Sequence, residues 1–405
     1  MLTGGRERML RQFFSDLSAG HLVNTVIAFI FAVTGPIAIL LTVGGKTGLS
    51  QAELSSWFIG AFCLNGLMSC LVSAYYRQPM VFLWSIPGIV VVGASLDHLS
   101  FSEIIGAYLS CGILLLVLGV TGLFARIEKH IPMPIVMGMV AGVLLTFGID
   151  WMKALTGSPW IAAPMTLAYF AVAAVPPLAR LCPPLIATLI VGSVTLIYSG
   201  DVSLPAGLTF KVVEPVIFWP EFSLRAQLEL VVPLALMVLF AQNGQGITLL
   251  RSSGYEPPVN VITVVCGYGS IISAWFGAVS TCLTGPVSGL LLSSSEPRGH
   301  YTGAVIVSLM LVFFGLLSPF FTAIFLATPA AFIATLGGIA LLNVLKVSFT
   351  TAFGGTFAFG ALVSFIVTLS GITFLNVGAP FWGIVGGLLT SLAMERGNFR
   401  KPPET

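Results

Sequence analysis

Long apolar stretches alternate with short polar connections along almost all of the 405 residues. A transmembrane helix needs about 20 consecutive apolar residues, because the hydrocarbon core of a bilayer is about 30 Å thick. By this measure the pattern predicts fourteen membrane-spanning segments, two of which are irregular. The predicted segments are 20–43, 52–73, 80–96, 101–124, 133–153, 160–178, 183–199, 227–250, 258–277, 279–295, 302–323, 328–346, 355–375 and 378–394.

Composition agrees with a chain whose main solvent is lipid. Hydrophobic residues make up 57% of the sequence and charged residues only 8%, whereas soluble domains carry about 25% charged residues. The net charge of +2 lacks the basic excess that nucleic-acid binding needs, so we expect no nucleic-acid partner. No short apolar core with a cleavage site follows the basic N-terminus, so we expect the first segment to stay in the membrane.

Lysine and arginine are divided unequally between alternate connections. If the N-terminus is cytoplasmic, thirteen of them fall on the cytoplasmic side and four outside, which is the bias of the positive-inside rule. The distribution therefore predicts that both termini are cytoplasmic. The cytoplasmic set is Arg6, Arg8, Arg11, Arg77, Arg126, Lys129, Arg180, Arg251, Arg298, Lys346, Arg396, Arg400 and Lys401. The external set is Lys46, Lys153, Lys211 and Arg225.

An odd number of segments on each side of a long connection predicts an inverted repeat. The external connection 200–226 separates seven segments in residues 1–199 from seven in residues 227–405. The second set therefore enters the membrane from the opposite side. Shifting the sequence on itself by 197 positions supports the repeat, because it aligns identical residues. The matches are Gly88 with Gly285, Gly106 with Gly303, Ala107 with Ala304 and Pro132 with Pro329.

The two irregular segments, the third and the tenth, occupy matching positions in the two halves. In each, an extended run meets Pro87-Gly88 or Gly285-Pro286, and a short helical run follows. Proline is favourable in the first turn of a helix, and ten residues of helix cover about half of the hydrocarbon thickness. The pattern predicts half-helices that begin near the membrane centre, where such breaks mark a transporter's substrate site. The alternative is that these residues only kink two ordinary helices.

Three carboxamide side chains end the most apolar run of the eighth segment, in FAQNGQGI (240–247). On an α-helix, Gln242, Gln245 and Gly246 share a face, and Asn243 lies about 100° away. Two facing helix N-termini favour an anion, and amides donate and accept hydrogen bonds without adding charge. The pattern predicts a site for a small anion, and the alternative is that the amides join helices. The candidate substrate-binding residues are Trp84, Ser85, Pro87, Gly88, Phe240, Gln242, Asn243, Gln245, Gly246, Thr281, Thr284 and Gly285.

No carboxylate lies at the centre of a predicted segment. Asp150, about one turn from the external end of its segment, is the deepest, so it is our candidate for proton coupling; the alternative is an ion pair with Lys153. The six cysteines and four histidines lack metal-ligand spacing, and the sequence contains no catalytic motif of the common enzyme classes. We therefore expect no metal, no cofactor and no enzymatic activity.

Five stretches form a recognisable set: DLSAG (16–20), YRQPM-x-x-x-WSIPG (76–88), AGVLL-x-FGID (141–150), AQN-x-x-GI-x-LLRSSGY (241–255) and GAPFWGIVGGLL (378–389). Together they resemble the benzoate/proton symporter family of bacterial inner membranes, which is related to nucleobase, ascorbate and sulfate-type carriers. The likeness covers nearly the whole chain. It implies an all-α polytopic membrane protein of fourteen segments in two inverted repeats, with a core domain, a gate domain and half-helices that meet at the substrate.

The resemblance also implies something about charge. Similar uracil/proton symporters carry acids where Gln242 and Gly285-Pro286 stand, so their loss fits a substrate that is itself an anion. Trp84 and Phe240 would then flank an aromatic ring. We expect a secondary transporter that imports an aromatic carboxylate, above all benzoate, with protons by alternating access, and that can form a homodimer. The alternatives are a nucleobase or inorganic-anion carrier on the same fold, or an anion channel.

Overall fold

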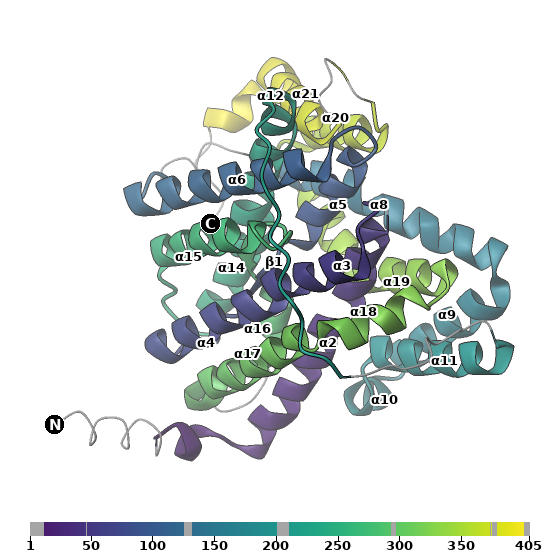
Figure 1. The fold of residues 1–405 in the computed structure, drawn as a ribbon. Coiled ribbons are helices and arrows are strands. Elements are labelled where there is room, and N and C mark those ends of the chain that lie inside the picture. The colour runs from purple at the N-terminus through teal and green to yellow at the C-terminus, as the bar shows by residue number, and fades with distance from the viewer. Residues whose placement is uncertain are drawn as a thin grey trace.

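The computed structural model describes residues 12–45, 47–124, 132–200, 210–292, 297–372, 374 and 379–400. Within these residues the chain is almost entirely helical (Figure 1). The first half contains α2 (Ala19–Gly44), α3 (Gln51–Phe58), the π-helical η1 (Ile59–Leu64), α4 (Asn65–Tyr76), β1 (Phe82–Trp84), α5 (Ile86–Ser95), α6 (Phe101–Thr121), α8 (Met133–Gly157), α9 (Pro159–Ala173), α10 (Pro176–Leu181) and α11 (Pro184–Ser199).

The second half repeats this order of elements. It contains α12 (Leu224–Ala226), the π-helical η3 (Gln227–Val231), α13 (Val232–Leu236), the π-helical η4 (Met237–Asn243), α14 (Gly244–Ser252), α15 (Val259–Ala274), β2 (Thr281–Leu283), α16 (Gly285–Leu292), η5 (Pro297–Gly299), α17 (His300–Leu316), α18 (Ser318–Leu326), α19 (Ala330–Phe353), α20 (Ala358–Leu369), α21 (Ala379–Met394) and η6 (Arg396–Arg400). The predicted segment 302–323 is therefore interrupted, because α17 ends before Leu317 and α18 begins after it.

The third and tenth segments are broken, as the sequence predicts. In each, a three-residue strand leads into a short helix: β1 into the ten-residue α5, and β2 into the eight-residue α16. The two strands pair antiparallel, with Leu83 opposite Cys282 at the centre of the ladder. This pairing supplies hydrogen bonds to non-helical backbone inside the protein, which is the condition for such backbone to exist at membrane depth.

Hydrogen bonds at the two ends of the ladder are related by symmetry. Ser85 donates its N–H to the carbonyl of Ser280 and Thr284 donates to the carbonyl of Val81, both over 2.9 Å. Equivalent residues in these two bonds lie 199 positions apart, and exchanging the two halves maps one bond onto the other. The half-helices are therefore true counterparts in the two repeats.

The shift of 197 positions holds only for part of the repeat. It fits α8 and α19, which begin at Met133 and Ala330. At the half-helices the shift is 199, so the counterpart of Gly285 is Ile86 and not Gly88. The two halves differ by two residues between these points, and a single gap-free alignment cannot show this.

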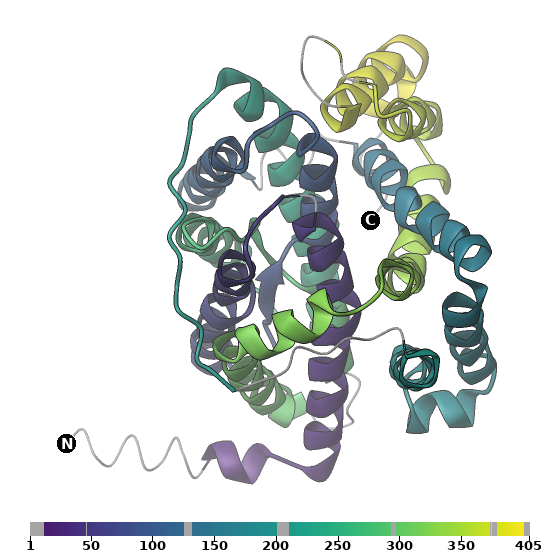
Figure 2. The same ribbon diagram turned by 45° about the vertical axis from the view of Figure 1, so that its right-hand side comes forward.

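The helices gather into two bundles (Figure 2). We call α2 to α6 with α12 to α17 the core bundle, and α8, α9, α11, α19, α20 and α21 the gate bundle. In the gate bundle α8 packs against α19 and α20, and in the core bundle α6 packs against α15 and α4 against α17. The bundles meet where α2 contacts α19 and where η4 and α5 contact α8.

An extended segment, 210–223, lies across one end of the core bundle and is visible as the long teal strand-like trace in Figures 1 and 2. It is bonded to four separate elements. Val213 N–H donates to the carbonyl of Leu316, Phe218 N–H to that of Trp275 and Glu221 N–H to that of Ser102, each over 2.9 Å. A hydroxyl on α3 also exchanges hydrogen bonds with the backbone at position 216. We call this segment the strap. It belongs to the predicted connection 200–226, of which residues 201–209 lie outside the described residues.

Candidate substrate site

A small cavity of about 30 Å³ lies at the start of the two half-helices. The core bundle supplies most of its wall, and α19 of the gate bundle closes it. No charged side chain is among the described residues that line it. The lining residues are Phe31, Ala32, Pro36, Leu83, Trp84, Ile86, Gln242, Gln245, Thr284, Pro286, Val287 and Val344.

The three carboxamides of segment eight have different roles. Asn243 is fully buried; its Oδ1 accepts the Leu283 N–H over 2.8 Å and its Nδ2 lies 3.4 Å from the Cys266 sulfur. Asn243 thus holds β2 in place. Gln242 and Gln245 line the cavity, and among the described residues neither side chain makes a hydrogen bond. The alternative that amides join helices therefore describes Asn243, whereas Gln242 and Gln245 leave their polar atoms available to a ligand.

Gln242 and Gln245 reach one cavity because they are three residues apart, a spacing that places side chains on one side of a helix. Gln242 lies near the end of η4 and Gln245 in the first turn of α14. Two glycines next to them allow close packing. A Cβ on Gly285 would lie 2.8 Å from the Cγ of Gln245, and one on Gly246 would lie 2.8 Å from the Leu283 side chain. The amides thus lie directly against β2 and α16.

The first turn of α16 presents unpaired donors. Among the described residues the N–H groups of Gly285 and Val287 make no hydrogen bond, and neither does the Thr284 hydroxyl. Thr284 and Val287 both line the cavity. Free N–H groups and the positive end of the helix dipole favour an anion at this point. The indole N–H of Trp84, another lining residue, also lacks a partner within the described chain.

Two of the predicted hydroxyl groups are instead bonded within the scaffold. The Ser85 hydroxyl accepts the Gly88 N–H over 3.2 Å and so caps α5. The Thr281 hydroxyl donates to Asn65 Oδ1 over 2.8 Å, and the Thr281 N–H donates to the Ser270 hydroxyl over 2.9 Å. Neither Ser85 nor Thr281 lines the cavity. These residues hold the half-helices in position.

A second, much larger cavity of about 1210 Å³ adjoins the first at Gln242 and Gln245. We call it the vestibule. It extends between the bundles to Arg251 and Phe399, at the end of the molecule that the charge distribution predicts to be cytoplasmic. Among the described residues that line it, Arg251 is the only charged one. The one charge in the described lining is therefore positive, and it would attract an anion to the outer end of the vestibule.

The vestibule also contains two of the predicted site residues. Pro87 and Phe240 line it, whereas Trp84 lines the small cavity. The Phe240 ring packs edge-on against Phe124, with 5.6 Å between ring centroids. Trp84 and Phe240 thus belong to adjoining spaces and not to one wall.

Asp150 is half exposed, with 52% of its side-chain surface accessible. Its Oδ1 lies 3.2 Å from the Nζ of Lys153, one turn further along α8. This is the ion pair that the sequence left open as the alternative. The coupling role of Asp150 stays a prediction.

Residues of α2, α8 and α19 that the sequence did not point to also line the site. Phe31, Pro36 and Val344 reach the small cavity, and Met133 and Ser348 line the vestibule. Pro36 lies inside α2, so a proline within a predicted segment was a usable signal. The others are ordinary apolar or hydroxyl residues of membrane helices, and only the packing of the two bundles distinguishes them.

Two kinds of comparison place the chain among known proteins by sequence. The family described as benzoate membrane transport protein matches residues 15–393. The inner membrane protein YdcO of Escherichia coli (strain K12) is 29% identical over 373 residues, which cover 90% of this chain and 93% of that protein. The benzoate membrane transport protein of Acinetobacter baylyi (strain ATCC 33305 / BD413 / ADP1) is 27% identical over 385 residues, or 94% and 96% of the two chains.

Solved structures share the fold at low sequence identity. The transmembrane domain of the cyanobacterial bicarbonate transporter BicA superposes with a TM-score of 0.62 at 16% identity, covering 91% of this chain and 97% of that one. SLC26A9 gives 0.64 at 12% identity, covering 93% of this chain and 66% of that one. These domains have seven plus seven segments in inverted repeats, so the predicted fold class is confirmed.

Proposed function

The chain belongs to the benzoate membrane transport protein family, and from this membership we propose that it imports an aromatic carboxylate, benzoate first of all, together with protons. It is a multi-pass membrane transporter and not an enzyme. We place it in the bacterial inner membrane, where YdcO is found by its description, with both termini cytoplasmic as the positive-inside bias predicts.

One observation carries the proposal. Unpaired donors from three elements converge on a cavity that has no carboxylate in its described lining: the amides of Gln242 in η4 and Gln245 in α14, and the first N–H groups of α16. A carboxylate accepts hydrogen bonds at both oxygens, so it would satisfy donors that otherwise remain unpaired. The glutamine oxygens could also accept the N–H groups of a neutral base, but the acidic side chain that similar uracil carriers have at the position of Gln242 is missing here.

The size of the two cavities suggests how the ring is accommodated. About 30 Å³ holds one water molecule, whereas a cavity of about 150 Å³ holds benzene. The carboxylate therefore fits at the start of α16, and the ring extends past Gln242 and Gln245 into the vestibule. Trp84 and Phe240 then border opposite ends of the bound acid.

The arrangement of the vestibule supports alternating access. The site is connected by the vestibule to the predicted cytoplasmic end, and both bundles line this path. Rocking of the core bundle against the gate bundle would close the vestibule and open a path on the other side, where the strap lies. A carrier of this kind binds its substrate at the repeat interface near the midplane.

The decisive experiment is an uptake panel in proteoliposomes. Radiolabelled benzoate, substituted benzoates, uracil, bicarbonate and sulfate are each supplied with and without an inward proton gradient. We expect accumulation of benzoate above equilibrium, and its loss when an uncoupler is added. Accumulation of uracil in place of benzoate would refute the assigned substrate class.

An inorganic anion is the second candidate, because the small cavity by itself suits a small anion and a bicarbonate transporter shares the fold. Bicarbonate and sulfate in the panel test this directly. An anion channel would equilibrate benzoate without concentrating it, so accumulation separates a carrier from a channel.

A further inference from the structure

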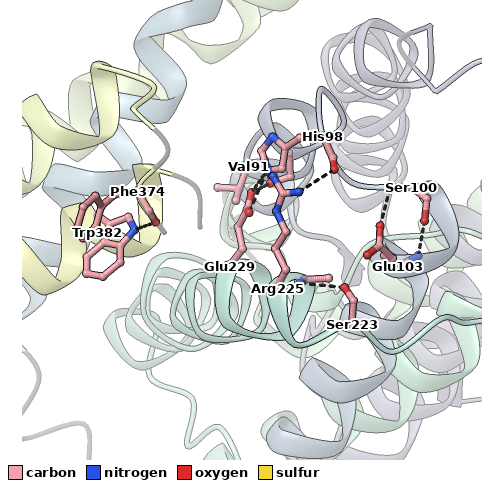
Figure 3. Close-up of polar contacts among 11 residues, drawn as sticks. Val91, His98, Ser100, Glu103, Ser223, Arg225, Glu229, Phe374 and Trp382 are labelled. Carbon is pink, nitrogen blue, oxygen red and sulfur yellow. Dashed lines mark hydrogen bonds and ion pairs between the residues drawn. The ribbon is translucent and has the colours of Figure 1, made fainter. Parts of the chain in front are cut away.

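A buried carboxylate–imidazole pair lies at the end of α5 that is remote from the cavity (Figure 3). Glu229, in η3, is only 1% exposed. Both of its carboxylate oxygens lie 3.0 Å from the Nε2 of His98, and the Ser95 hydroxyl donates to one of them. His98 retains 20% of its side-chain exposure. The pair is therefore enclosed on the carboxylate side and reachable by water through the imidazole.

The pair attaches the C-terminal end of α5 to the start of segment eight. Ser95 is the last residue of α5, and His98 follows two residues after the C-cap Leu96. Arg225 strengthens the junction by donating to the His98 carbonyl over 3.3 Å. The first turn of α5, at the other end of the same helix, borders the small cavity through Ile86. Ten residues of helix separate these ends by about 15 Å.

Few other charges surround the pair. The elements that pack against η3 are α6, α12, α13 and α21. Of these, α6 contributes Glu103 and the buried Tyr108 and Cys111, and α12 contributes Arg225, while α13 and α21 contain no titratable side chain. The turn after α5 adds the exposed Asp97. Glu103 is engaged with Ser100 in the capping box of α6, so of the carboxylates named here only Glu229 is both buried and in contact with an imidazole.

We propose that Glu229 and His98 bind a proton whose occupancy is linked to anion binding at the opposite end of α5. The inference rests on the proposed function, because it takes the anion in the cavity as given. Both are positioning residues, since neither touches the cavity. The proton comes from external water and binds to the pair; no bond of the substrate forms or breaks.

The linkage follows from charge and distance. One more proton makes the pair more positive by one charge. At about 15 Å and an effective dielectric constant of about 20, this raises the affinity for an anion at the cavity about five- to tenfold. Linkage is reciprocal, so a bound anion raises the affinity of the pair for its proton by the same factor. Because each increases the affinity for the other, the anion and the proton would be bound at the same time and imported together.

The test is equilibrium binding of radiolabelled benzoate to the purified full-length protein at pH 6 and pH 8. Carboxylic acids titrate near pH 4, so benzoate is ionised at both values. We expect the wild type to bind about five- to tenfold more tightly at pH 6. The double variant His98→Gln/Glu229→Gln keeps hydrogen-bonding groups at both positions but cannot titrate, and its affinity ratio should fall to about one. Glu103→Gln, a neighbouring acid outside the pair, should keep the wild-type ratio.

Other results of the binding experiment would contradict the proposed linkage. A wild-type ratio in the double variant overturns the inference, and so does an equal loss of affinity at both pH values with the ratio preserved. If the double variant binds nothing, the two single variants decide, and a wild-type ratio in both overturns it. Wild-type protein that binds benzoate without pH dependence refutes this inference alone. Wild-type protein that binds no benzoate refutes the proposed function as well.

Discussion

The two half-helices occupy equivalent positions in the repeats but differ in what their first turns leave open. In α5 the Ser85 hydroxyl accepts the Gly88 N–H, so among the described residues only the Ile86 N–H of the first turn makes no hydrogen bond. In α16 the equivalent hydroxyl, that of Thr284, makes no hydrogen bond among the described residues, and two backbone N–H groups stay free. The first turn of α5 is thus capped by its own side chain, whereas that of α16 leaves one more N–H and a hydroxyl open at the candidate site. Equivalent position in a repeat therefore does not imply equivalent function.

The largest effect should come from adding a charge beside α16. Gln242→Glu places a carboxylate next to the bound carboxylate, and like charges at about 4 Å repel by several kcal/mol even at an effective dielectric constant of about 20. We expect benzoate uptake to fall at least about 100-fold. The control is Gln51→Glu, which adds the same charge at an exposed position. Unchanged uptake in Gln242→Glu would remove the cavity from the transport path.

The second-largest effects should distinguish the structural role of Asn243 from the ligand-binding role of Gln245. Asn243→Ala leaves the buried Leu283 N–H without its acceptor, so we expect a loss of stability of about 1–3 kcal/mol, measured as a lower Tm of the detergent-solubilised protein. Gln245→Ala breaks no hydrogen bond within the described chain, and should lower benzoate affinity with little change in Tm. If Gln245→Ala proved the less stable of the two, the assignment of roles would be reversed.

A matched pair of substitutions tests the comparison directly. Ser85→Ala removes a helix cap, which typically costs about 1 kcal/mol of stability, and should lower Tm more than affinity. Thr284→Val removes a free hydroxyl beside the anion, and should weaken benzoate binding about tenfold, the equivalent of one hydrogen bond, at nearly constant Tm. Equal effects of both variants on affinity would mean that both half-helices contact the substrate alike.

The smallest effect is expected outside the half-helices. Asp150 and Lys153 form an exposed ion pair, and such pairs contribute about 0–1 kcal/mol. We expect Asp150→Asn to change the Tm little and, if the predicted coupling role is correct, to lower proton-driven uptake more than benzoate exchange. Equal effects on the two would remove Asp150 from the coupling role.

Features with local causes could be predicted from the sequence. The fourteen segments follow from hydropathy, and the half-helices follow from proline and glycine placed at one depth in both halves. The capping box of Ser100 and Glu103 likewise needs only four neighbouring residues. These predictions succeed because the bilayer constrains the length and pairing of every segment.

Features that depend on distant partners could not be predicted. Gln242 and Asn243 are neighbours with similar chemistry, and only the position of β2, some 40 residues further on, makes one a support and leaves the other available. The same holds for Glu229, which looks like an ordinary acid near a membrane surface until His98 is placed beside it. The π-helical turns of segment eight also have no recognisable signal in the sequence.

The paired strands between the half-helices are symmetric, but the residues that follow them make the two sides of the site different. Because Leu83 lies opposite Cys282, the pseudo-twofold axis of the repeats passes between them. The backbone around the substrate is therefore nearly symmetric about this axis. The side chains are not symmetric, because α5 begins with Ile86 whereas α16 begins with Gly285. A flat acid with one charged edge would therefore favour one orientation, with its carboxylate toward α16 and its ring toward the vestibule.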